Sequence, residues 1–203
     1  MMSKKTADKL KDVDRVLLIT KNSLGDLKDK DPNKRISGIY NVAVWGRSVT
    51  NVLQNLRSVE PEFNSWYDPY AQEMKNDPLM RFFYELRSEV LKEGTTEFGT
   101  STIINNLSPQ SFARIERPPF ETEGFFMGDE IGGSGWDIKL PDGSTEKYYV
   151  AIPPDIGGSY INFSNPPTSH LGKDCSGKSI YELCQMYVEY LESMVKDAKK
   201  RFS

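Results

Sequence analysis

The sequence predicts a mainly α-helical protein: a bundle of four or five helices with a β-hairpin inserted before the last helix. Two observations lead to this prediction. Apolar residues recur at helical spacing through residues 6–94 and again through residues 178–202. Between them, residues 95–178 are rich in Gly, Pro, Ser and Thr and contain one clear hairpin pattern. We therefore expect a single domain over residues 1–203, in which residues 95–178 form a loop-rich insertion.

Two long helices are expected in the first part of the chain. The first, from about Thr6 to Lys28, carries one stripe of apolar side chains that faces its neighbours. The segment DKDPNK then breaks the helix, and Pro32 suits the first turn of a second helix that ends near Ser58. Gly46 lies within the apolar stripe of this second helix, where a glycine indicates close approach of another backbone.

The third helical region divides in two. Four aromatic residues and Met74 recur at helical spacing over residues 63–74, and Pro69 is expected to kink this stretch. Asp77 then suits the N-cap of a fourth helix, with Pro78 in its first position and Gly94 just after its end. Local chemistry therefore predicts both ends of the fourth helix.

The insertion and the last helix complete the fold. Residues 136–152, WDIKLPDGSTEKYYVAI, alternate in polarity on both sides of a Pro-Asp-Gly-Ser turn and predict the hairpin. The segment FFMGDEIGG suggests one more short strand, whereas residues 152–179 are expected to be irregular. The last helix runs from about Lys178 to Phe202.

Composition and charge argue against several classes of protein: nucleic-acid binding through overall charge, secreted, membrane-spanning and zinc or redox proteins. The net charge of −3 gives no whole-molecule attraction for nucleic acid, so binding there would require a local basic patch. The N-terminal segment is charged and lacks the apolar core of a signal peptide, and no apolar run reaches membrane-spanning length. Cys175 and Cys184 lack the spacing of a zinc or redox pair. We expect a cytoplasmic protein with reduced thiols, no membrane contact, no metal and no cofactor.

Several other motifs are expected to be structural. The segment GDEIGGSG lacks the ending of a phosphate-binding loop and is interpreted as a turn between strands. The acidic residues Asp129, Glu130, Asp137 and Asp142 do not follow the spacing of a calcium loop. His170 stands alone among prolines and serines and is expected to be exposed, with no second metal ligand at a suitable spacing.

Two helical surfaces are candidate binding sites. On the second helix, Arg47 and Asn51 belong to a polar run that either lines a cleft or subunit interface or forms a solvated face. On the fourth helix, Tyr84, Arg87 and Ser88 lie beside the buried stripe. Arg87 is either part of such a binding site or a partly exposed arginine that pairs with a neighbouring glutamate.

The segment ELRSEVLKEG on a late helix of such a bundle resembles the HEPN superfamily. Many members carry Arg, a small polar residue, about three variable residues and then His, and the Arg and His of two subunits meet at a dimer interface and cleave RNA without metal. Arg87 and Ser88 match the first half of this motif, but Lys92 stands where the His would be. The resemblance covers mainly residues 6–94 and 178–202, and it implies a homodimer.

The missing histidine weighs against catalysis. Metal-independent RNA cleavage needs a group that moves a proton near neutral pH, as His does at its ordinary pKa. We therefore expect a non-catalytic interaction or regulatory module, in a bacterial stress or defence setting, that forms a homodimer and has an RNA or protein partner. The alternatives are a ribonuclease that uses Arg87 with Lys92, and a small-molecule binding module whose pocket lies between bundle and hairpin.

Overall fold

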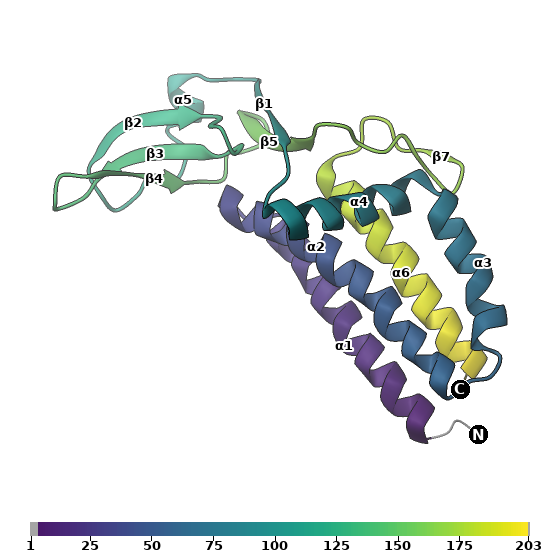
Figure 1. Ribbon diagram of the computed structural model, residues 1–203. Coiled ribbons are helices and arrows are strands. Elements are labelled where there is room, and N and C mark those ends of the chain that lie inside the picture. The colour runs from purple at the N-terminus through teal and green to yellow at the C-terminus, as the bar shows by residue number, and fades with distance from the viewer. Residues whose placement is uncertain (1–3, 203) are drawn as a thin grey trace. The chain divides into compact units, whose positions relative to one another are not determined.

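A computed structural model describes residues 4–202 (Figure 1). The chain is largely helical and also contains antiparallel sheets, and it divides into two compact units. The first, called here the helical unit, comprises Met1–Leu27, Ser37–Thr96 and Asn165–Ser203. The second, the sheet unit, comprises Lys28–Ile36 and Glu97–Ser164.

Five long helices and one short 3₁₀ helix account for most of the helical structure. They are α1 (Lys4–Asp26), α2 (Pro32–Leu53), the 3₁₀ helix η1 (Gln54–Ser58), α3 (Phe63–Asn76), α4 (Pro78–Glu93) and α6 (Ile180–Phe202). The predicted second helix therefore ends at Leu53, and η1 continues it to Ser58. The α3 helix passes through Pro69 as one element.

The core of the helical unit is built on α6. Its buried side chains occupy more than a single stripe, and it packs against α1 and α4. Leu183, Leu191 and Met194 are almost fully buried there, as are Phe83 of α4 and Val42 of α2. Burial of such side chains is the main stabilising contribution to the unit.

The ends of α4 follow the predicted local chemistry. The Asp77 carboxylate accepts a hydrogen bond of 2.9 Å from the Met80 backbone N–H, Pro78 occupies the first helical position, and Gly94 has a φ of 73°. An N-cap carboxylate satisfies an N–H that the helix leaves unbonded, and glycine adopts the left-handed C-terminal conformation without strain. The predicted caps of this helix are confirmed.

His170 was expected to be exposed, and this is wrong. It lies at the end of β6 (Ser169–His170), which pairs with β7 (Lys173–Asp174), and it is only 7% exposed. Its Nδ1 is 3.0 Å from Oδ1 of Asp77, while the Leu171 N–H donates to Oδ2 at 2.7 Å. Burial acts to raise the pKa of Asp77, but the hydrogen bonds from Leu171, His170 and Met80 outweigh it and lower the pKa.

The sheet unit contains two separate antiparallel sheets. One has the strand order β2 (Thr122–Met127), β3 (Ser134–Lys139), β4 (Thr145–Tyr149), and the other pairs β1 (Phe98–Ile104) with β5 (Gly157–Phe163). The predicted hairpin is the β3–β4 pair, whose turn is closed by a 2.8 Å bond from Leu140 N to Ser144 O. The expectation that residues 152–179 are irregular is wrong, because β5, β6 and β7 lie there.

The sheet unit has its own small core, and the short helix α5 (Pro109–Phe112) contributes to its edge. The buried members are Ile115, Trp136, Ile138, Val150 and Ile156. The GDEIGGSG segment is an ordered turn between β2 and β3, in which the Asp129 carboxylate accepts bonds from the N–H groups of Ile131 and Gly133. Among residues 4–202, no three His, Cys, Asp or Glu side chains are grouped so that they could hold a metal ion.

Two further findings concern the whole described chain. No helix within residues 4–202 has both the length and the apolar character needed to cross a bilayer. Cys175 and Cys184 are both buried as free thiols, and burial raises the pKa of each, so both are kept as neutral thiols.

Candidate functional site

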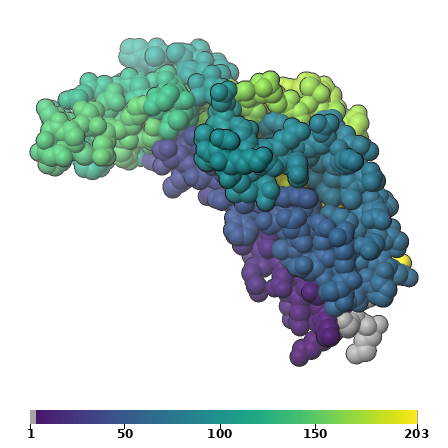
Figure 2. Space-filling model, viewed as in Figure 1, coloured from purple at the N-terminus to yellow at the C-terminus, as the bar shows by residue number. Residues whose placement is uncertain are grey.

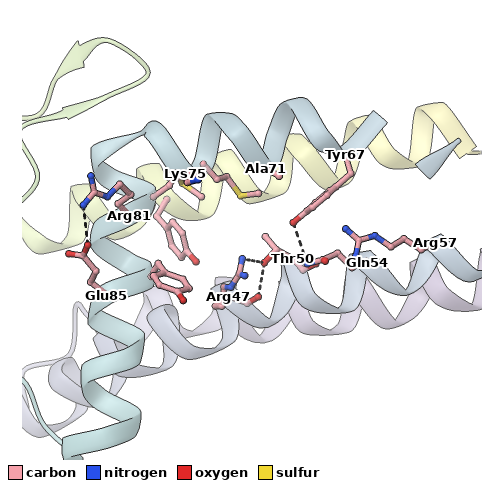
Figure 3. Close-up of a pocket in the computed structure, with 13 residues that line it drawn as sticks. Arg47, Thr50, Gln54, Arg57, Tyr67, Ala71, Lys75, Arg81 and Glu85 are labelled. Carbon is pink, nitrogen blue, oxygen red and sulfur yellow. Dashed lines mark hydrogen bonds and ion pairs between the residues drawn. The ribbon is translucent and has the colours of Figure 1, made fainter. Parts of the chain in front are cut away.

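The helical unit contains a cavity of about 560 Å³ (Figure 3). This volume lies within the usual range for small-molecule sites. Helices α2, α3 and α4, which supply most of its lining, are visible together on the face shown in Figure 2. The lining residues, which define the α2–α4 pocket, are Arg47, Thr50, Gln54, Arg57, Tyr67, Ala71, Met74, Lys75, Met80, Arg81, Tyr84, Glu85 and Tyr187.

One wall of the pocket is a line of polar side chains along α2 and η1. Arg47, Thr50, Gln54 and Arg57 are spaced by three or four residues, so they follow one side of the helix next to its buried stripe. The guanidinium of Arg47 donates a 2.8 Å hydrogen bond from Nη1 to Oγ1 of Thr50. That hydroxyl in turn donates to the Arg47 carbonyl at 2.9 Å. The Arg47 side chain is therefore held in place, and its guanidinium has further N–H groups besides the one used in this bond.

Tyr84 lies on the α4 side of the pocket, beside Arg47. The Arg47 guanidinium carbon is 5.5 Å from the centre of the Tyr84 ring, which is within the range of a cation–π contact. Tyr84 is nevertheless 53% exposed. A large aromatic ring with that exposure offers an apolar surface beside a fixed positive charge.

Tyr67 of α3 adds a buried hydroxyl. It is 4% exposed, and its oxygen lies 3.4 Å from Nε2 of Gln54, while Arg57 lies 5.8 Å from its ring centre. Burial raises the pKa of Tyr67, although the positive charges of Arg47 and Arg57 oppose the change. The hydroxyl therefore keeps its proton near neutral pH and can donate it in a hydrogen bond.

Positive charge dominates the pocket. Four cations line it, namely Arg47, Arg57, Lys75 and Arg81, against the single carboxylate of Glu85. Only Arg81 pairs with that carboxylate, at 3.4 Å, and both side chains are more than 60% exposed, so the pair is weak. Within residues 4–202, the other three cations form no ion pair. The pocket is thus a local excess of positive charge in an acidic chain.

Tyr187, which lines the floor of the pocket, explains why residue 46 is a glycine. A Cβ at this position would lie 2.3 Å from Cε1 of Tyr187, a ring that is 3% exposed and stacks on Phe83 at a centroid distance of 4.2 Å. A close approach at Gly46 was expected from another backbone, but the structure shows the side chain of Tyr187 there instead. Burial also raises the pKa of Tyr187, which keeps the floor uncharged.

The predicted binding residues are only partly brought together. Arg47 and Tyr84 both line the pocket, whereas Asn51 and Ser88 do not. Asn51 lies about 40° beyond Arg47 around the helix, on the side away from Thr50 and Gln54, and it is exposed. The Ser88 hydroxyl donates to the Tyr84 carbonyl at 2.9 Å, so it is used within α4.

The predicted catalytic residues lie outside the pocket. Arg87 is half-buried and Lys92 is exposed, both in the second half of α4. In the part of the chain that the structure describes, neither side chain makes a hydrogen bond or an ion pair. Among the described residues, Arg87 therefore has no hydrogen-bonded partner that could transfer a proton.

Sequence reasoning missed several pocket cations. Arg57 was visible as a flanking residue of the polar run on the second helix, at the right spacing from Arg47 and Gln54. Lys75 and Arg81 come from the end of α3 and the first turns of α4, and no local pattern links them to α2. Only the packing of the three helices brings these charges together.

The chain is similar to one known family. Residues 25–112, which are less than half of the chain, match the family described as bacteriophage lambda protein ea47. The match contains every lining residue of the α2–α4 pocket except Tyr187. No curated protein and no solved structure matches the chain.

Proposed function

We propose that the helical unit is a non-catalytic module that binds a small organic anion, with phosphate or carboxylate groups, in the α2–α4 pocket. One observation carries this proposal: the pocket holds four cations and one carboxylate, although the chain as a whole is acidic. A bound anion would make charge-assisted hydrogen bonds to guanidinium groups that are already oriented. The Tyr67 hydroxyl supplies a further donor, and the Gln54 amide, which donates to the Thr50 carbonyl at 3.3 Å and to the Tyr67 hydroxyl at 3.4 Å, holds that hydroxyl in place.

The composition of the pocket supports binding rather than catalysis. No His or Cys is among its lining residues, and its one carboxylate is paired with Arg81. Proton transfer near neutral pH is most often carried out by His or by a carboxyl group of shifted pKa. The available groups instead suit recognition, because guanidinium, ammonium, amide and neutral phenol groups donate hydrogen bonds without giving up a proton.

The test is calorimetric titration with inorganic tripolyphosphate and with citrate at low ionic strength. We expect saturable binding of at least one of them, with one molecule per chain. Arg47→Gln and Lys75→Gln are each expected to weaken it by about 10-fold or more, because a hydrogen bond to a charged group contributes about 1.5–3 kcal/mol. Higher salt is expected to weaken the binding further.

Two substitutions on α4 serve as matched controls. Arg87→Gln and Lys92→Gln also remove one positive charge each, but from residues that do not line the pocket. They are expected to leave the affinity within about twofold of the unaltered protein, since charges that do not touch the bound anion act on it only weakly through water. The proposal is contradicted if neither anion binds, or if the controls weaken binding as much as the pocket substitutions do.

The alternative function is RNA cleavage by Arg87 with Lys92, and its test is separate. Protein free of nucleic acid is incubated with RNA in the presence of EDTA, beside the Arg87→Ala variant. The binding proposal expects intact RNA with both proteins, because Lys92 stands where the motif has His, the residue that moves protons near neutral pH. Cleavage that is lost in Arg87→Ala would favour the ribonuclease instead.

We also propose a HEPN-like arrangement of the helical unit, a homodimeric state, and a role in bacterial stress or defence. The five long helices and the position of Arg87 and Ser88 on α4 support the first. The similarity to a family named for a bacteriophage protein supports a bacterial setting. The binding of a protein or RNA partner would then depend on whether the α2–α4 pocket is occupied.

A further inference from the structure

One strand of the sheet unit has an open edge. Among the described residues, β1 pairs only with β5, through seven successive residue pairs without a bulge. In an antiparallel pair, the N–H and C=O groups of alternate residues point away from the partner strand. Gly99 to Ile104 are all exposed, and within residues 4–202 no strand pairs with the outer edge of β1.

The open edge lacks the features that usually prevent pairing with another chain. Natural edge strands are protected by charged side chains, proline, bulges or short length. The seven residues of β1, FGTSTII, include no charged residue and no proline. Ile103 and Ile104 are 51% and 58% exposed, so apolar side chains also face water at one end.

The residue pattern of β1 fits a second copy of itself. Apolar residues lie at the two ends, and the hydroxyl residues Thr100, Ser101 and Thr102 lie in the middle. In antiparallel pairing about a two-fold axis at Ser101, each Phe98 faces Ile104 of the other copy, and each Thr100 faces Thr102. Apolar pairs and hydroxyl pairs across antiparallel strands are stabilising. No like charges meet, because the strand has none.

We propose that β1 is an interaction surface for a second copy of this chain, joined edge to edge through an antiparallel β1–β1 pair. The pairing would create a four-stranded sheet in the order β5–β1–β1–β5. A two-stranded ribbon is only marginally stable by itself, and additional strands satisfy its open edge. A closed two-fold interface of this kind uses the same patch on both subunits and stops at the dimer. This surface is independent of the α2–α4 pocket.

The experiment places a positive or a negative charge at Ser101, the residue on the proposed two-fold axis. Molar mass is measured by sedimentation or light scattering over a range of concentrations, for the unaltered chain, Ser101→Lys and Ser101→Glu. The unaltered chain is expected to be a dimer. Each variant alone is expected to dimerise about 10-fold or more weakly, because like charges face each other at the centre of the pair. An equimolar mixture of the two variants is expected to recover the dimer, because opposite charges then meet.

The mixture also separates loss of pairing from loss of folding, since misfolded variants would not recover a dimer. Leu91→Lys is the matched control: Leu91 is 55% exposed, lies on α4, and is not part of β1. It is expected to leave the dimer intact. The proposal is overturned by a chain that stays monomeric at all concentrations, by dimers that persist equally in both Ser101 variants, or by a dimer that Leu91→Lys disrupts and Ser101→Lys does not.

Discussion

Asp77→Ala is expected to lower the free energy of unfolding of the helical unit by about 3 kcal/mol. The substitution removes the N-cap of α4 and also leaves buried hydrogen-bond donors without an acceptor. The Asp77 carboxylate is 6% exposed and accepts three hydrogen bonds: from the backbone N–H groups of Met80 and Leu171 and from the His170 ring. Removing it leaves all three donors without their acceptor. Urea unfolding followed by the helical circular-dichroism signal measures the change.

A matched control separates capping from the buried network. The Asp31 carboxylate also accepts an N–H bond near the start of a helix, from Asn33 at 2.9 Å, but in an exposed position. Asp31→Ala is therefore expected to cost only about 1 kcal/mol. Equal effects of the two substitutions would show that the bonds to His170 and Leu171 contribute nothing.

The stabilising effect of Asp77 is also expected to depend on pH. Its pKa in the folded protein is lowered, so the carboxylate stabilises the fold above the unfolded-state pKa of about 3.9, and this contribution is lost as the pH falls through the lower folded value. The stability advantage of the unaltered protein over Asp77→Asn should therefore shrink between about pH 5 and pH 3. An advantage that grows over this range would contradict the hydrogen-bond network.

Gly46→Val is expected to destabilise the helical unit by about 3 kcal/mol, and Gly46→Ala by about 1–2 kcal/mol, through overpacking against Tyr187. Alanine would normally stabilise a helix interior by about 1 kcal/mol relative to glycine. At Gly46, however, the added Cβ would lie 2.3 Å from Cε1 of Tyr187 and 3.0 Å from its Cζ. The ring cannot easily yield, because it is buried and stacked on Phe83. Thermal or urea unfolding measures both variants.

Gly25→Ala is the control for Gly46→Ala, because it is expected to stabilise the helical unit. Gly25 lies within α1, and a Cβ there would meet nothing within 4 Å, so this substitution is expected to stabilise by about 0.5–1 kcal/mol. In a Tyr187→Ala background, Gly46→Ala should lose its penalty, because the obstructing ring is gone. If Gly46→Ala and Gly25→Ala had the same effect, the assigned role of Gly46 would be wrong.

The elements that the sequence predicts well are those fixed by local chemistry. The cap residues Asp77, Pro78 and Gly94 determine the ends of α4 through bonds to residues at most a few positions away. The β3–β4 hairpin likewise carries its turn and its alternation within residues 136–149. These signals need no knowledge of the rest of the fold.

The features that the sequence could not predict depend on distant partners. His170 is buried because Asp77, 93 residues earlier in the chain, accepts its hydrogen bond. The β1 strand has no buried residue and therefore no buried face to detect, and β5, which begins Gly-Gly-Ser, buries only Gly157, Ile161 and Phe163. The α2–α4 pocket gathers cations from three elements, and the sequence indicated only the Arg47 side of it.

The position of the anion site can be observed through the backbone amide signals of isotope-labelled protein during titration with tripolyphosphate. We expect concentration-dependent shifts for Arg47, Gln54 and Arg57 on one wall and for Lys75 and Arg81 on the other, with little change at Arg87 and Lys92. That result would place the anion in the α2–α4 pocket. Shifts that cluster elsewhere, or a spectrum unchanged at saturating anion, would contradict the proposed function.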